Sequence, residues 1–230
     1  MALKKMCILA FVVILGTSIT NCNTKARGQT VLAQTVSPSQ TESAEQNGNI
    51  NNILIAYFST SEVVDRSLID PSVDATTQAS VVIPNMQIVA SYINETIGGD
   101  LFSIRTVKQY PVSSSELNAM GYAERDANAR PELSTHVENM DTYNTIFLCY
   151  PNWCGTIPMA VATFLEEYDF SGKTIIASTT HFGSGFGSSI RDIRNLVPNT
   201  EVVTGFSGNG RNVRNARGDV VRWLNTLGLN

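Results

Sequence analysis

The segment TIFLCYPNWCGT, residues 145–156, joins an uninterrupted apolar run to a proline and a polar turn. An apolar run of this length, bounded by turn residues, is typical of a strand buried on both faces of a parallel sheet. The turn carries Trp153, and a large aromatic side chain in a polar loop is unfavourable in water unless something flat or apolar covers it. The segment therefore predicts a buried parallel strand followed directly by a loop that meets a ligand.

The same pattern repeats along the chain. Further apolar runs of strand length occupy residues 53–58, 101–104, 174–178 and 201–204. Amphipathic helical patterns occupy residues 86–97, 157–168, 188–196 and 213–227. Apolar strands that alternate with amphipathic helices predict a parallel sheet covered on both faces. We therefore expect an α/β fold, a doubly wound three-layer sandwich with a five-stranded parallel sheet.

The loops that follow the strands mark the expected site. In an open α/β sheet, ligands bind beyond the carboxyl ends of the strands. The unusual loops are residues 59–61 after the first strand, 151–156 after the third and 179–187 after the fourth. Gly183 and Gly185 in the last of these would let the backbone approach a ligand closely.

The N-terminus has the pattern of an export signal. Lys4 and Lys5 precede an apolar stretch, residues 7–15, that is too short for a comfortable membrane span. Cys22 follows at the place where bacterial lipoproteins carry the acylated cysteine. We expect residues 1–22 to be a signal peptide with Cys22 as the candidate lipidation site, which would place the protein in the bacterial cell envelope. The alternatives are simple secretion and an uncleaved anchor.

Residues 23–51 are rich in Thr, Gln, Ser, Asn and Glu, as in TVSPSQTESAEQNGN, and lack apolar periodicity. Such a segment cannot bury enough surface to fold, so we expect a disordered polar linker that would separate a lipid-anchored domain from the membrane. The chain of 230 residues is 43% hydrophobic, which is enough to give residues 52–230 a single core.

Composition and spacing argue against several classes of protein. The net charge is −4 and the 16 Lys and Arg residues are scattered, so the basic stripe of a nucleic-acid-binding protein is absent. Cys149 and Cys154 lack the paired spacing of zinc ligands, so we expect no metal, and they are either free thiols or a disulfide. None of Ser184, Ser188 and Ser207 has both of the flanking glycines of a hydrolase nucleophile elbow.

Several segments together resemble the flavodoxin-like family, and specifically a branch of secreted or lipid-anchored bacterial members. They are AYFS (56–59), GGDLF (98–102), NARPEL (128–133), YPNWCGT (150–156), FLEEYDFSGK (164–173) and TTHFGSG (179–185). The resemblance runs from about residue 53 to the end of the chain. It implies the flavodoxin-like strand order 2-1-3-4-5, non-covalent FMN as the cofactor, and one- or two-electron chemistry.

The resemblance also implies roles for the residues around the flavin ring. The isoalloxazine ring needs aromatic or apolar walls, and hydrogen-bonding groups at its polar edge. Trp153 would stack on or flank the ring, and His181 would donate to its edge or to a substrate. The alternatives are that Trp153 packs under its own loop and that His181 caps backbone at its strand end. The other residues expected at the ring are Pro151, Asn152, Cys154, Gly155, Thr180, Phe182, Gly183 and Gly185.

The FMN phosphate is expected at two separate segments. Ser59 and Thr60 follow the first strand and would contribute hydroxyl groups. Asn85 is expected to cap the next helix, so that the N–H groups of Met86 and Gln87 would meet the phosphate at the positive end of the helix dipole.

Three departures from the family pattern leave two functions open. Glu62 would repel a phosphate, Met86 lacks the hydroxyl of a threonine, and Cys154 replaces the family's second tryptophan. The first function is that of an FMN-binding protein that transfers electrons, or reduces a small acceptor such as a quinone, at the cell envelope. The alternative is a non-catalytic envelope lipoprotein that retains the fold without FMN.

The connection over residues 111–141 is long for an α/β link, and long ordered connections near a sheet edge are often lids. Arg125 and Arg130 within it would face the flavin or a substrate anion, or else belong to a surface helix held by Glu–Arg pairs. The sequence does not decide between these roles.

Overall fold

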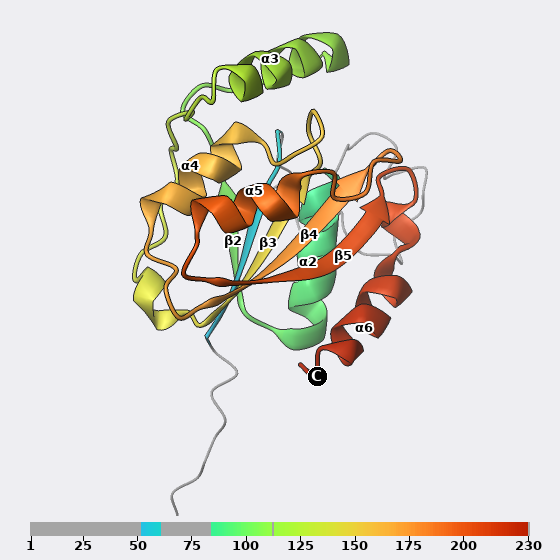
Figure 1. Ribbon diagram of the computed structural model, residues 1–230. Helices are drawn as coiled ribbons and strands as arrows, with labels where there is room; N and C mark the ends of the chain where they lie inside the picture. Colours follow the sequence, from blue (N-terminus) through green and yellow to red (C-terminus); the bar gives the residue numbers. More distant parts are fainter. Residues whose placement is uncertain (1–51, 61–83, 112, 230) are drawn as a thin grey trace, which may run out of the picture. The chain divides into compact units, whose positions relative to one another are not determined.

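The computed structural model describes residues 52–60, 84–111 and 113–229 (Figure 1). The predicted signal peptide, Cys22, the predicted linker and Glu62 lie outside the described residues. The strands are β1 (Ile53–Phe58), β2 (Asp100–Ile104), β3 (Thr145–Pro151), β4 (Thr174–His181) and β5 (Glu201–Asn209). They form one five-stranded sheet in the order β2-β1-β3-β4-β5, and every neighbouring pair is parallel. The predicted sheet and its strand order are confirmed.

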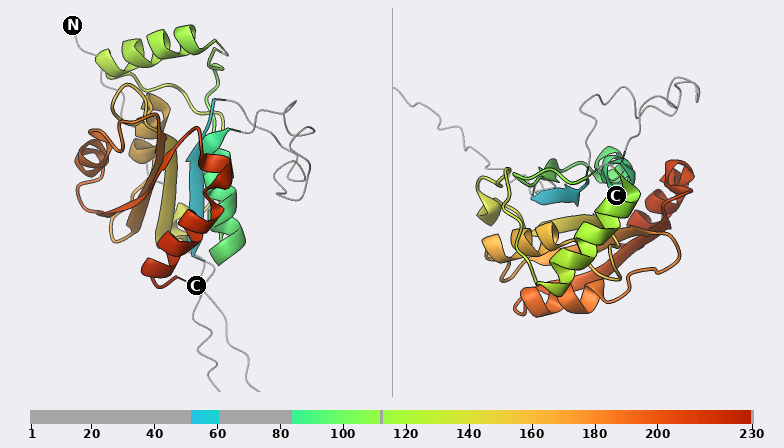
Figure 2. Two further views of the ribbon diagram at one scale, coloured as in Figure 1. Left: turned by 90° about the vertical axis from the view of Figure 1, so that its right-hand side faces the viewer. Right: turned by 90° about the horizontal axis from the view of Figure 1, so that it is seen from above.

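Helices cover both faces of this sheet. They are α2 (Asn85–Ile97), α3 (Ser114–Asp126), α4 (Met159–Glu167), α5 (Ser189–Leu196) and α6 (Arg217–Thr226), with 3-10 turns η2 (Met140–Thr142) and η3 (Val213–Asn215). The view from above in Figure 2 shows α2 and α6 on one side of the sheet, and α4 and α5 on the other. Both side views place α3 beyond the upper ends of the strands (Figures 1 and 2).

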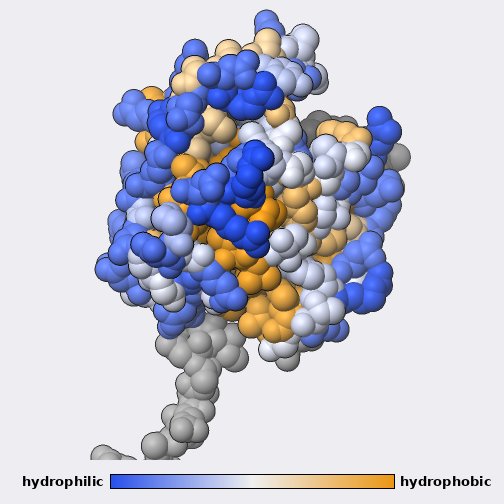
Figure 3. Space-filling view, viewed as in Figure 1, coloured by the Kyte–Doolittle hydropathy of each residue, from blue (hydrophilic) through white to orange (hydrophobic). Residues whose placement is uncertain are grey.

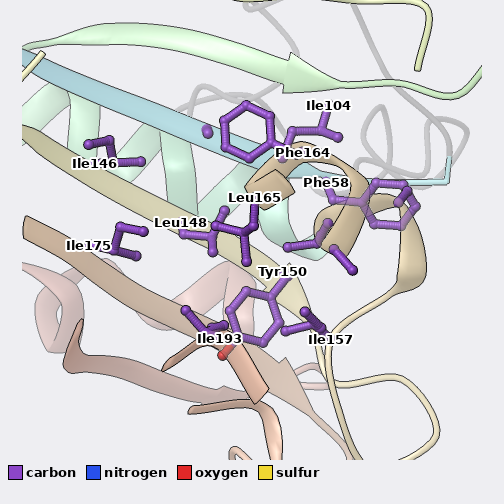
Figure 4. Close-up of a cluster of buried hydrophobic side chains, with 14 of the residues drawn as sticks. Phe58, Ile104, Ile146, Leu148, Tyr150, Ile157, Phe164, Leu165, Ile175 and Ile193 are labelled. Carbon is purple, nitrogen blue, oxygen red and sulfur yellow. The ribbon is translucent and has the colours of Figure 1, made fainter. Parts of the chain in front are cut away.

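The apolar strands separate two cores. Along β1, Leu54, Ala56 and Phe58 face the core beneath α4 and α5. The alternate residues Ile55 and Tyr57 face the core beneath α2 and α6, as expected from side chains that point to opposite faces in turn. Figure 4 shows the first of these cores, in which side chains of β3 meet Phe164 and Leu165 of α4. Burial on both faces explains why β1 and the interior of β3 are apolar throughout.

Two features differ from the sequence-based expectation. β4 and β5 run further than their apolar segments, because Thr179, Thr180 and His181 pair with residues 207–209 of β5. These three residues therefore lie in a strand and not in the predicted loop. The helix α3 was not among the predicted amphipathic helices; Gly121 is its one buried residue among those described. In the described part of the chain, no helix has the length and apolar character that a membrane span requires.

Candidate functional site

The structure brings the loops after β3 and β4 together at the carboxyl end of the sheet. Pro151 and Thr180 are partners across the two strands. The next residue, Asn152, donates its backbone N–H to the carbonyl oxygen of Thr180 at 2.8 Å. Ser59 and Thr60 follow β1, the other neighbour of β3, and are half-buried. The parallel sheet thus places the predicted loops on one edge, as expected.

The loop after β3 is a tight hairpin turn. Trp153 donates its N–H to Thr156 O at 2.9 Å, and Thr156 donates to Trp153 O at 2.8 Å. The central residues Cys154 and Gly155 have φ values of 51° and 86°. Positive φ at both positions is the signature of a type I′ turn, whose backbone holds the peptide groups at the tip in defined directions. The structure therefore presents Cys154 and Gly155 on a rigid tip.

Trp153 is half-buried in an aromatic cluster. Its ring meets Phe58 and Tyr110 edge to face, with centroids 5.6 and 5.2 Å away. Such pairs add stability beyond the apolar area they bury. The indole is therefore held by its neighbours, which supports the alternative that it packs under its own loop, while its remaining surface lies beside the turn.

The side chain of Asn152 ties the two loops to each other. Its Nδ2 donates to the carbonyl oxygen of Gly185 at 2.6 Å. The backbone N–H of Ser188 donates to Gly155 O at 2.8 Å, close to Gly187. The second polar atom of Asn152, its Oδ1, is buried and has no partner among the described residues. A buried acceptor without a donor is costly, so this oxygen is available to a ligand that carries an N–H.

A carboxylate supports the same turn from α5. Asp192 accepts hydrogen bonds from Thr156 Oγ1 at 2.6 Å and from Ser188 Oγ at 2.5 Å. Burial raises the pKa of Asp192, but the hydrogen bonds from Ser188 and Thr156 outweigh it and hold that pKa below its usual value. Asp192 thus stabilises the turn as an ionised group.

Glycines leave room beside the two loops. Gly155, Gly183 and Gly185 all have positive φ, and an added Cβ at any of them would meet nothing within 4 Å. Gly187 differs, because a Cβ there would lie 2.3 Å from Gly155 O. The other three glycines therefore leave space in which a flat ligand could lie close to the backbone. Asn152 Oδ1, three residues before Gly155, offers a hydrogen-bond acceptor. The residues present therefore fit the ring of a flavin.

The segment expected to bind the FMN phosphate differs from the prediction at the start of α2. The prediction that Asn85 caps α2 is wrong: Pro84 occupies the N-cap position, with extended backbone, and Asn85 is the first helical residue. Its amide group instead lies against Gly210 of the segment after β5. The buried Met86 accepts a hydrogen bond from Thr180 Oγ1 at its sulfur, with a separation of 3.1 Å, so the Thr180 hydroxyl is engaged within the protein. Gln87 is buried in the first turn of α2.

His181 turns toward its own loop. Its Nδ1 accepts the backbone N–H of Gly183 at 2.9 Å, in agreement with the alternative of backbone capping. Its neighbour Phe182 is 72% exposed, and the guanidinium of Arg211 lies 5.9 Å from the phenyl centroid. Phe182 is therefore an accessible aromatic surface on the loop after β4.

A cavity of about 280 Å³ lies on the α4–α5 side of the turn. Figure 3 shows hydrophobic side chains reaching the surface between these helices. The lining residues are Arg125, Asn128, Arg130, Thr156, Ile157, Met159, Ala162, Asp192, Asn195 and Leu196. Arg125 and Arg130, which the sequence left between the flavin or a substrate anion and a surface helix, both line this cavity, whereas the residues expected at the flavin ring and phosphate do not. Within the described ranges, Cys149 and Cys154 are free thiols, and no cluster of metal-ligating side chains is present.

Sequence reasoning missed the contribution of α3. Arg125 Nη1 donates to the carbonyl oxygen of Cys154 at 2.9 Å, and Gly121 lies against the Cys154 sulfur. The hydroxyl of Tyr110 donates to Glu124 of the same helix at 3.0 Å, and burial raises the pKa values of both groups. The pattern Ser113-x-x-Glu116 is a helix-start signal that could have revealed α3.

Comparisons with known proteins agree with this architecture. A search of curated proteins finds no match. Solved structures with a similar fold include a candidate flavoprotein from Bacteroides eggerthii, 24% identical with a TM-score of 0.55, over 74% of this chain and 98% of that one. A flavoprotein from Lactobacillus acidophilus in complex with FMN is 15% identical, with a TM-score of 0.53, over 72% of this chain and 97% of that one. A family model described as Flavodoxin matches residues 52–227. That match spans all five strands and the helices around them, so the chain belongs to the flavodoxin family.

Proposed function

We propose that this protein binds FMN at the loops after β3 and β4, and transfers electrons or reduces a small acceptor such as a quinone at the bacterial cell envelope. The main observation behind the proposal is the hydrogen bond by which Asn152 connects these two loops. Asn152 binds Gly185 through Nδ2 and leaves its buried Oδ1 without a partner among the described residues, beside glycines whose Cβ positions are open. Family membership and the FMN complex of the Lactobacillus acidophilus relative support the same cofactor.

Bound FMN would supply the one- or two-electron chemistry. The protein would provide the surroundings. Asn152 Oδ1 would accept a hydrogen bond from an N–H at the polar edge of the ring, and the backbone N–H groups of Cys154 and Gly155 would be available as donors. Trp153, with Phe58 and Tyr110 behind it, would form an apolar wall that keeps water from one side of the ring.

The test is a titration of the full-length protein, purified in detergent, with FMN. We expect flavin absorption bands to shift and tryptophan emission to fall, with a dissociation constant in the micromolar range or tighter, on the order of 8 kcal/mol of binding free energy. Absence of binding at high micromolar FMN would overturn the proposal.

The chain provides a matched pair of controls, because its two tryptophans lie on opposite faces of the sheet. Trp153 belongs to the turn after β3 and packs on the α4–α5 face, whereas Trp223 belongs to α6 and packs against Phe147 and Phe206 on the other face. We expect Trp153→Phe to remove the larger part of the quenching, and Trp223→Phe to retain it. Equal quenching in both variants would contradict a ring site beside Trp153.

The second candidate is a non-catalytic envelope protein that keeps the fold without FMN. Two observations favour it: Thr180 Oγ1 is engaged by Met86, and the Nδ1 of His181 is engaged by Gly183. Both side chains would therefore have to rearrange to reach a cofactor. The same titration separates the candidates, because this protein would bind neither FMN nor riboflavin.

We propose the envelope location on sequence grounds alone. The charged and apolar stretches before Cys22 have the order of a lipoprotein signal, and residues 23–51 have the composition of a spacer. An acceptor that dissolves in the membrane, such as a quinone, would then be within reach of the tethered domain.

A further inference from the structure

The helix α3 is seated on the turn through two residues of one helical face. Gly121 and Arg125 are four positions apart, a spacing that places them on the same side of a helix. A Cβ on Gly121 would lie 3.2 Å from the Cys154 sulfur and 3.8 Å from Cε3 of Trp153. Arg125 then reaches the carbonyl oxygen of Cys154 at 2.9 Å. Both contacts converge on the tip residue Cys154.

The guanidinium of Arg125 is itself held in place. Its Nε and Nη2 donate to Asp126 Oδ1 at 2.9 and 2.7 Å. Its Cζ lies 4.9 Å from the centroid of the Tyr122 ring, within cation–π range. With these groups engaged, Nη1 remains to bind Cys154 O. Because the group is fixed before it binds the carbonyl, little further order is needed to make that bond.

The bond from Arg125 fixes the direction of one peptide group. In a trans peptide, the C=O and N–H bonds point in opposite directions. With the Cys154 carbonyl directed to α3, the N–H of Gly155 points away from α3. That N–H and the N–H of Cys154 have no acceptor among the residues that the structure describes, and Gly155 is exposed.

We propose that Arg125 is a positioning residue for the flavin site: it holds the Cys154 carbonyl on α3, so that the Gly155 N–H is presented to the polar edge of the ring. The inference rests on the proposed function. It also assigns a role to the connection over residues 111–141, which contains α3. A donor aimed at the ring edge stabilises the reduced flavin, which carries more negative charge, more than the oxidised form. Arg125 would therefore influence both FMN affinity and reduction potential without touching the cofactor.

The test compares Arg125→Ala, Arg125→Lys and Arg222→Ala in the full-length protein. Arg222 is a matched control, because it is also an exposed arginine that pairs with an aspartate on its own helix, α6. We expect Arg125→Ala to weaken FMN binding about fivefold to tenfold, the range for one hydrogen bond, and to make the midpoint potential of bound FMN more negative. Arg125→Lys keeps a hydrogen-bond donor and should recover part of the affinity and part of the potential. Arg222→Ala should have the FMN affinity and midpoint potential of the wild type.

Stability and exchange measurements separate positioning from a structural role. We expect the melting temperature of Arg125→Ala to stay within about 2 °C of the wild type, because the side chain is 38% exposed. Hydrogen–deuterium exchange should nevertheless be faster in the peptide that covers residues 152–157. Unchanged affinity and potential in Arg125→Ala, with FMN still bound by the wild type, would overturn this inference alone. Failure of the wild type to bind FMN would overturn the proposed function, and this inference with it.

Discussion

Gly187 marks the closest approach between the two loops of the candidate site. Its φ is +55°, and its Cβ position would lie 2.3 Å from Gly155 O and 3.0 Å from Asn152 Nδ2. The next residue, Ser188, donates its N–H to the same Gly155 oxygen. Any side chain at position 187 would therefore separate the turn after β3 from the loop after β4. The glycine is required by space and by backbone conformation together.

Replacement of Gly187 by alanine tests this contact. We expect Gly187→Ala to lower the free energy of unfolding by about 2–4 kcal/mol, from backbone strain and the clash with Gly155 O. Urea unfolding followed by circular dichroism measures the change. Gly218→Ala is the matched control: Gly218 lies in α6, the nearest atom to an added Cβ is 3.4 Å away, and alanine favours a helix by about 1 kcal/mol. Equal stability of the two variants would contradict the close approach.

The helix α5 supports the site through a single carboxylate. Asp192, in its first turn, accepts the hydroxyls of Ser188 and Thr156, which belong to the two loops. Since these bonds lower its pKa in the folded protein, folding favours the ionised form. The stability they add is present above the unfolded pKa, about pH 4, and is lost as the pH falls through the lower folded pKa.

The variant Asp192→Asn tests that link. We expect it to be less stable than the wild type near neutral pH, and to lose less stability below about pH 4, because it has no carboxylate to protonate there. Urea unfolding at a series of pH values measures both effects. Asp219→Asn, which removes an exposed carboxylate from α6, should keep the acid dependence of the wild type. A parallel pH dependence for wild type and Asp192→Asn would rule out this role.

Elements with strong apolar patterns were predictable, and those without were not. β1 and β3 were readable because their interior residues are all apolar and buried. The ends of β4 and β5 were not, because Thr179, Thr180 and Ser207 carry no apolar signal and are placed by strand pairing. The apolar pattern did not predict α3 for a related reason. Its one buried residue is a glycine, which has no side chain and so creates no apolar periodicity.

The same limit applies to the candidate site. The loop positions followed from strand order, because parallel strands bring their carboxyl ends to one edge. The side-chain partners did not follow. Asn85 resembles an N-cap residue, yet Pro84 takes that position, and Met86 is directed to Thr180 by packing between α2 and β4. Contacts between residues distant in sequence, such as Arg125 with Cys154, require the fold itself.

At the scale of the whole domain, the candidate site and the start of β1 lie at opposite edges of the sheet. All strand pairs are parallel and β1 begins at Ile53, so the chain enters the sheet at its amino-terminal edge (Figure 1). The turn at Cys154 and the loop at Gly185 lie at the carboxyl edge. A tether joined before β1 would leave those loops free to meet an acceptor.

The proposed tether is tested by the fate of Cys22 in a bacterial host. We expect the wild-type protein to partition into the detergent phase after Triton X-114 extraction, and its mature N-terminus to be an acylated Cys22 by mass spectrometry. Cys22→Ser should move the protein to the aqueous phase or leave it uncleaved, because the thiol that accepts the lipid is absent. Cys154→Ser, which changes a free thiol within the domain, should partition as the wild type. A wild-type protein that stays in the aqueous phase with a different mature N-terminus would favour simple secretion. If the wild type and Cys22→Ser both enter the detergent phase uncleaved, and the wild type carries no acyl group, the result would favour a retained anchor. Simple secretion would leave the domain without a tether, so that any access to a membrane-dissolved acceptor would have to come from the domain surface. A retained anchor would keep the domain at the membrane without a lipid.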